Sequence, residues 1–187
     1  DYRPQDLAAF FGKAERTGFT LSPEERELLK ILEDTGVLTR EGGALKSGKG
    51  AFISISRESD RYFRRLFINH EASHALFFQD ERYRALAQSR WRALSEPERR
   101  FWNVFLSNRD YDPFDAYLSY NEFQAYMTQQ SLSQLEDWLK NVAYARLAKS
   151  YPDRAQAILD DLSAALPGFV EHAAALDSYL RENYGLR

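Results

Sequence analysis

Apolar residues recur every three to four positions along most of the chain, a spacing typical of helices that bury one face. This spacing predicts two N-terminal helices, at residues 4–16 and 22–35. The second begins with a Ser-Pro-Glu-Glu start signal and ends at Gly36. From Glu58 onward the pattern is helical to the end, with helix breaks expected near residues 80, 95–97, 108–113, 151–152 and 167–168.

One segment, residues 51–57, instead alternates apolar and polar side chains, which predicts a strand. The Gly-rich stretch before it, residues 41–50, is expected to form a mobile loop. The fold class indicated is therefore mainly α with a small β component (α+β). No linker is long enough to separate domains. We expect a single domain over residues 1–187, made of N-terminal helices and the loop (1–50), the strand and a helix (51–79), and a helical part (80–187).

The composition indicates that the chain can form a substantial hydrophobic core, and it argues against several classes of function. Hydrophobic residues make up 44% of the 187 residues and aromatic residues 14%, so the chain is not a disordered segment. Trp91, Trp102 and Trp138 are expected in the core. The 25 basic and 28 acidic residues nearly balance, which argues against a nucleic-acid partner bound through its phosphates. No apolar stretch approaches the ~18 residues of a membrane span.

The chain contains no cysteine, so disulfides, thiolate metal sites and cysteine nucleophiles are excluded together. A cysteine-free chain is well suited to an oxidising compartment, and the alternative is a cytosolic domain, since many of these also lack cysteine. Together with a first residue, Asp1, that is not methionine, the lack of cysteine favours an extracytoplasmic location, periplasmic or secreted.

The most informative segment is His70-Glu71-Ala72-Ser73-His74, an HExxH motif within a predicted helix. Two histidines four residues apart lie on one helical face, where both imidazoles can reach a single metal ion. They continue the apolar stripe of Phe63 and Phe67. A chance HExxH is expected in roughly one in a few hundred chains of this composition, so two packed core histidines are the competing interpretation.

A second element, Asn121-Glu122-x-x-Ala125, follows on a later predicted helix. HExxH followed by Asn-Glu-x-x-Ala resembles the gluzincin clan of zinc metallopeptidases. The resemblance implies a zincin-like domain in which His70, His74 and Glu122 bind one Zn²⁺ ion. It further implies that Glu71 is the general base, taking a proton from water that attacks the carbonyl of a peptide or protein substrate.

Several gluzincins place an Asp four residues after the third ligand, but this chain has Tyr126 there. Tyr126 is therefore a candidate to support a ligand or to donate to the oxyanion, while Asn121 and Asp115 are candidates to hold a histidine ring. Members of the clan often supply a late His, Tyr or Arg to the oxyanion. His172 fits that role by its order along the chain, and the alternative is an ordinary packing histidine.

The predicted strand suggests a way to bind substrate, because an extended peptide can add to an edge strand. Residues 52–57 would supply that edge and the Gly-rich loop at 42–50 a flap. The alternative is an internal hairpin strand. Three functions follow from the sequence. The first is a zinc metallopeptidase, and the second is a binding or regulatory module that keeps a zincin scaffold without useful turnover. The third is hydrolysis of a non-peptide amide or ester by the same residues, which the sequence does not separate from the first.

Overall fold

The computed structural model describes residues 3–58 and 60–186. It is mainly helical with one two-stranded sheet, which confirms the mainly α fold class. The chain divides into two compact units, residues 1–59 and 60–187. The reason is that the apolar side chains form two separate clusters, one within each unit.

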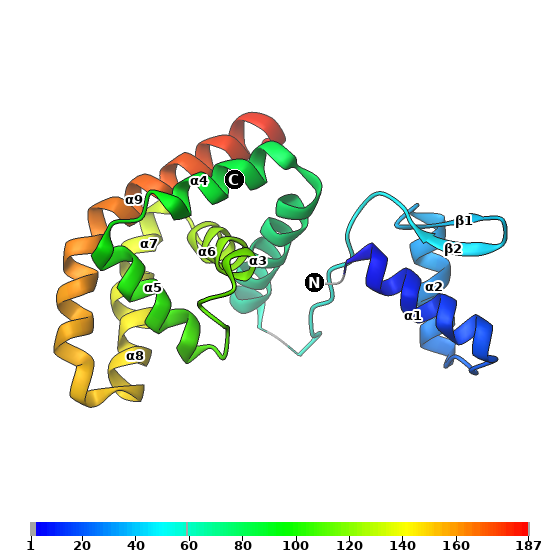
Figure 1. The fold of residues 1–187 in the computed structure, drawn as a ribbon, viewed down its shortest axis with the longest axis horizontal. Helices are drawn as coiled ribbons and strands as arrows, with labels where there is room; N and C mark the ends of the chain where they lie inside the picture. The colour runs from blue at the N-terminus through cyan, green and yellow to red at the C-terminus, as the bar shows by residue number, and fades with distance from the viewer. Residues whose placement is uncertain (1–2, 59, 187) are drawn as a thin grey trace. The chain divides into compact units, whose positions relative to one another are not determined.

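The first unit contains two helices and a β-hairpin (Figure 1). Both predicted helices are confirmed, as α1 (Pro4–Thr17) and α2 (Pro23–Asp34). The start signal of α2 is a capping box, in which the Ser22 hydroxyl accepts from the Glu25 amide at 3.1 Å and the Glu25 carboxylate accepts from the Ser22 amide at 2.7 Å.

The sheet is not where the sequence pattern placed it. Strands β1 (Leu38–Glu41) and β2 (Ala44–Ser47) pair antiparallel, and the Gly-rich stretch expected to be a loop supplies both β2 and the turn. Gly42 and Gly43 have φ of 56° and 82°, the left-handed values that a two-residue hairpin turn requires.

The strand predicted at residues 51–57 is wrong. This segment is irregular apart from a single bridge residue, Phe52, which packs against the core of the first unit. Alternation of apolar and polar side chains indicates which of them could be buried. A strand also needs a neighbouring strand along its length, and the sheet in the described residues pairs β1 with β2. The edge strand expected for peptide binding is therefore not formed.

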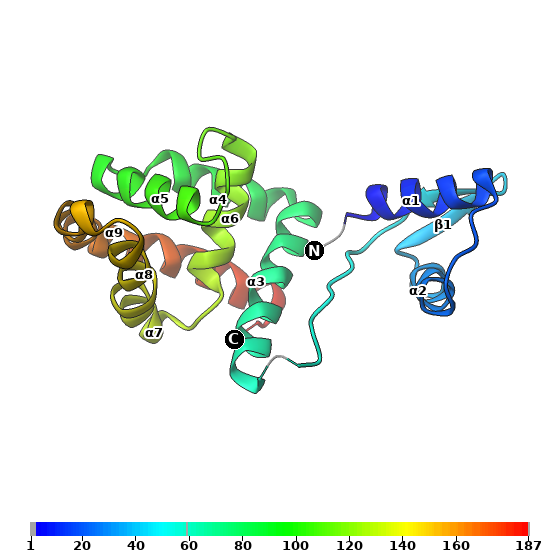
Figure 2. The same ribbon diagram turned by 90° about the horizontal axis from the view of Figure 1, so that it is seen from below.

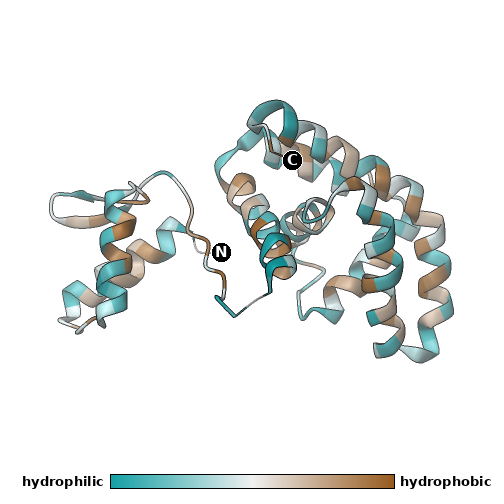
Figure 3. Cartoon of the chain, turned by 180° about the vertical axis from the view of Figure 1, so that it is seen from behind, coloured by the Kyte–Doolittle hydropathy of each residue, from teal (hydrophilic) through white to brown (hydrophobic). Residues whose placement is uncertain are grey.

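The second unit is a helical bundle (Figures 1 and 2). Its helices are α3 (Arg61–Gln79), α4 (Glu81–Arg92), α5 (Glu96–Asn108), α6 (Ala116–Thr128), α7 (Leu132–Trp138), the π-helical segment η1 (Leu139–Tyr144), α8 (Ala145–Ser150), the short 3-10 helix η2 (Pro152–Arg154) and α9 (Ala155–Tyr184). Each α-helix of this unit contains both hydrophilic and hydrophobic residues, as Figure 3 shows. None of the helices in the described part of the chain has the length and apolar character needed to cross a membrane.

Helix α6 is the central element of this bundle. It contacts α3, α4 and α9, and every residue from Asn121 to Thr128 is buried. The three tryptophans, Trp91, Trp102 and Trp138, are buried in the same core, as predicted. Polar side chains on α6 are therefore held away from water by the surrounding helices, which is the setting for the site described below.

The break expected at residues 167–168 is also wrong, because α9 runs through Pro167. An internal proline removes one helical hydrogen bond and bends the helix, and Figure 1 shows α9 changing direction along its length. Gly168 follows at the point where α9 meets α5. A Cβ atom there would lie 2.2 Å from Oε1 of Glu98, so this position has no room for a side chain.

We expect Gly168→Ala to destabilise the protein by about 1–3 kcal/mol, because it forces the buried carboxylate of Glu98 to move. At an open helical position the same change would stabilise by about 1 kcal/mol. Gly12→Ala in α1 is the matched control, since its Cβ would meet only the flexible end of Arg16. Urea denaturation of both variants measures the difference, and a Gly168→Ala protein as stable as Gly12→Ala would contradict the packing described.

Candidate metal centre

Two helices bring together the three residues that the sequence analysis named as candidate metal ligands. His70 and His74 lie one turn apart on α3, and Glu122 lies on α6. One donor atom from each of the three lies within 4.8 Å of the other two, and all three residues are buried. The structure therefore forms a candidate metal site from residues that are distant in the sequence.

The spacing of the donor atoms fits one small cation. Nε2 of His70 and Nε2 of His74 are 3.1 Å apart, and each lies 3.6 Å from an oxygen of Glu122. Ligand atoms of a tetrahedral zinc site, with bonds of 2.0–2.1 Å, are separated by about 3.4 Å. Oε2 of Glu122 is also buried without a hydrogen bond, and a buried carboxylate oxygen needs such a partner.

Side-chain contacts hold α3 against α6 beside the site. The hydroxyls of Ser73 and Thr128 are 2.7 Å apart, and the Asn69 amide donates to the Gln129 carbonyl at 3.1 Å. Each helix also has a capped start, at Asp60 for α3 and at Asp115 for α6. The ligands are thus carried by two helices whose starts and mutual contacts are both fixed.

A chain of hydrogen bonds orients the ring of His74. Its Nδ1 lies 2.9 Å from Oδ1 of Asn121, and because an amide oxygen only accepts, Nδ1 carries the proton and Nε2 faces the other ligands. The Gln124 amide donates to the backbone carbonyl of Asn121 at 2.9 Å, and the Tyr83 hydroxyl donates to Oε1 of Gln124 at 2.8 Å. Of the two candidates for holding a histidine ring, Asn121 does so, whereas Asp115 caps α6.

Burial keeps His74 neutral. It lowers the pKa of His74 below the ordinary value, although the nearby carboxylate of Glu122 acts in the opposite direction. A neutral imidazole retains the lone pair that a metal ligand must offer. The site is therefore prepared to bind a cation near neutral pH.

Aromatic side chains also lie beside His70 and Glu122. The ring of Tyr126 meets the ring of His70 with centroids 4.6 Å apart, and the guanidinium of Arg109 lies 5.5 Å from the Tyr126 centroid. Burial raises the pKa of Tyr126, and burial together with the Glu122 carboxylate raises the pKa of Tyr111. Both phenols therefore stay protonated and can donate hydrogen bonds.

Sequence reasoning missed Tyr111 and Arg109. Both lie in or next to the connection between α5 and α6, which the sequence pattern marks only as a helix break. No local periodicity identifies a loop residue that folds back over a helix. Their position becomes apparent only when α6 is packed in the bundle.

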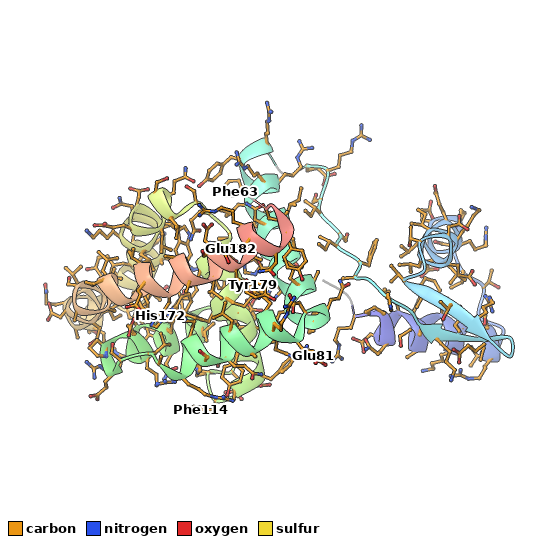
Figure 4. The ribbon with its side chains drawn as sticks, turned by 90° about the horizontal axis from the view of Figure 1, so that it is seen from above. Phe63, Glu81, Phe114, His172, Tyr179 and Glu182 are labelled. Carbon is orange, nitrogen blue, oxygen red and sulfur yellow. The ribbon has the colours of Figure 1, made fainter. Side chains whose placement is uncertain are left out.

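The two remaining predicted residues differ in their surroundings. Glu71 follows His70 on α3, is half-buried, and its charge acts on His74. His172 lies on α9 (Figure 4), where its Nε2 is 3.3 Å from Oε1 of Glu98 and its ring meets Phe123. The contacts described for His172 are thus with α5 and α6 core residues rather than with the metal ligands, and its oxyanion role stays a prediction.

We expect Asn121→Ala to weaken zinc binding about tenfold or more, because loss of the bond to Nδ1 frees the His74 ring to turn. Asn141→Ala is the matched control, since Asn141 is exposed and bonds only its neighbour Asp137 among the contacts described. Titration against a chromophoric zinc chelator measures both affinities. Equal zinc affinity in the two variants would show that Asn121 does not orient the ligand.

No known protein family, curated protein or solved structure matches this chain in sequence or fold comparisons. The candidate centre therefore rests on the chain's own residues and geometry.

Proposed function

We propose that this protein is a zinc-dependent hydrolase that cleaves peptide bonds. The observation that carries the proposal is the meeting of His70, His74 and Glu122 in one buried group, next to the acidic side chain of Glu71. The HExxH and Asn-Glu-x-x-Ala motifs, which resemble those of the gluzincin clan, supply the three ligand residues. The geometry of this group and the two sequence motifs therefore both support zinc-dependent hydrolysis.

The donor set favours zinc over other ions. Two imidazoles and one carboxylate suit a four-coordinate zinc ion, whereas calcium and magnesium prefer all-oxygen ligands. Three protein ligands also leave one position for water or substrate, as catalytic zinc sites do. We propose one Zn²⁺ per chain.

When bound, zinc polarises a carbonyl and lowers the pKa of water. Glu71 accepts the proton of the attacking water and passes it to the leaving amine. Asn121 keeps the proton of His74 on Nδ1, so that Nε2 stays available. Tyr126, kept protonated by burial, is the candidate donor to the oxyanion, and His172 is the alternative.

We expect Glu71→Gln to lower the rate of peptide cleavage about 10²–10⁴-fold while leaving zinc in place, because only the general base is lost. Glu81→Gln, an exposed position at the start of α4 (Figure 4), is the control and should cleave at the wild-type rate. The assay is cleavage of a degenerate peptide library, with zinc content measured on the same samples. A Glu71→Gln protein that cleaves as fast as wild type would refute the assignment of the base.

The second candidate function is a zinc-containing binding or regulatory module. The observation in its favour is that residues 60–186 contain no strand to which a substrate backbone could add. A zinc-loaded wild type that cleaves nothing in the library would support this function over hydrolysis.

A further inference from the structure

Exposed aromatic rings lie on α3 just before the metal ligands. Phe63 is 47% exposed and Phe67 44%, and their rings stack with centroids 5.9 Å apart. Figure 4 shows Phe63 near the start of α3, away from the bundle core. Two stacked phenylalanines in contact with water are costly unless something covers them.

These rings lie on the same helical face as the ligands. Residues 63, 67, 70 and 74 follow the spacing of four, three and four that lines one side of a helix. Phe67 is also one turn before Glu71, and side chains so spaced are neighbours, with Cβ atoms about 5–6 Å apart. The exposed rings thus continue directly from the proposed catalytic group.

A second aromatic surface lies beyond the ligands on α3. Phe78 is half-buried four residues after His74, and the ring of Tyr117 stacks on it at 6.4 Å with an interplanar angle of 24°. Tyr117 comes from α6 and is 47% exposed. Exposed aromatic surface is therefore present on both sides of the metal ligands. We call Phe63, Phe67, Phe78 and Tyr117 together the aromatic stripe.

We propose that the aromatic stripe binds the substrate through large apolar side chains on both sides of the scissile bond. The proposal rests on the peptidase function and names its substrate class. From Phe63 to Phe78, α3 rises about 22 Å, which matches about six or seven residues of extended peptide. The substrate is therefore a peptide segment with bulky apolar residues before and after the bond that is cleaved.

The stripe fits a peptide better than a membrane. Its two halves are separated by the buried polar group of His70, His74 and Glu122, which a lipid surface could not use. Because residues 60–186 contain no strand, the backbone of a substrate has no edge to pair with in this unit. Burial of apolar side chains against aromatic rings supplies affinity without such an edge.

The test uses two eight-residue peptides, one with Phe and Leu flanking the central bond and one with Ser at those positions. Their binding is measured by fluorescence anisotropy on zinc-loaded Glu71→Gln protein, alone and combined with Phe67→Ser or Tyr117→Ser. Ile68→Ser is the matched control, because Ile68 is 49% exposed on α3 but lies on another face. Cleavage of both peptides by zinc-loaded wild type is measured in parallel.

We expect the Phe/Leu peptide to bind more tightly than the Ser peptide, and Phe67→Ser and Tyr117→Ser each to weaken it about tenfold, because an aromatic contact surface is lost. Ile68→Ser should change binding less than about twofold. Equal binding of the two peptides, or equal losses in Phe67→Ser and Ile68→Ser, would overturn the proposal.

The outcomes also separate this proposal from the peptidase function. Cleavage of both peptides at equal rates would refute the aromatic stripe and leave the peptidase intact. Preferential binding of the Phe/Leu peptide without any cleavage would refute the peptidase and keep the stripe as a peptide-binding surface. Binding to vesicles of anionic lipid that is lost in Phe67→Ser, without a peptide preference, would assign the stripe to a membrane and overturn the proposal.

Discussion

Three buried polar side chains that face one another need a shared partner. His70, His74 and Glu122 meet between α3 and α6, and the two imidazole nitrogens approach to 3.1 Å. Two imidazole rings and one carboxylate have too few N–H groups at these facing atoms to satisfy all of the lone pairs by hydrogen bonds among themselves. A cation between them would satisfy these lone pairs together, so the second unit contains a buried group that is suited to a metal ion.

Side chains of α4 and α6 support the His70, His74 and Glu122 group. Tyr83 on α4 supports Gln124, Gln124 supports Asn121, and Asn121 holds His74. Tyr126, which is also on α6, packs against His70. Because α6 lies at the centre of the bundle, these contacts connect the His70, His74 and Glu122 group to α3, α4 and α6. Fixed ligands of this kind lose little freedom when a metal binds, which favours affinity.

Local patterns in the sequence predicted most of the helices and the three residues that the structure brings together as a possible metal site. The HExxH spacing fixes a common face for His70 and His74 once a helix is assumed, and the Asn-Glu-x-x-Ala motif identifies Glu122. Patterns that depend on distant partners were less informative. The alternation at residues 51–57 suggested a strand, but Phe52 forms only a single bridge there, and Pro167 suggested a break although α9 runs through it. Tyr111 carries no pattern, because its place beside Glu122 depends on a loop that folds over the bundle.

Metal content tests the central claim most directly. The measurement is plasma mass spectrometry on wild-type protein without a histidine tag, and on His74→Ala and Glu122→Ala, each after equimolar zinc and desalting. Shared coordination predicts about one zinc per chain in wild type and loss of that zinc in both variants. Wild type without zinc, or either variant with the wild-type zinc content, would contradict the account.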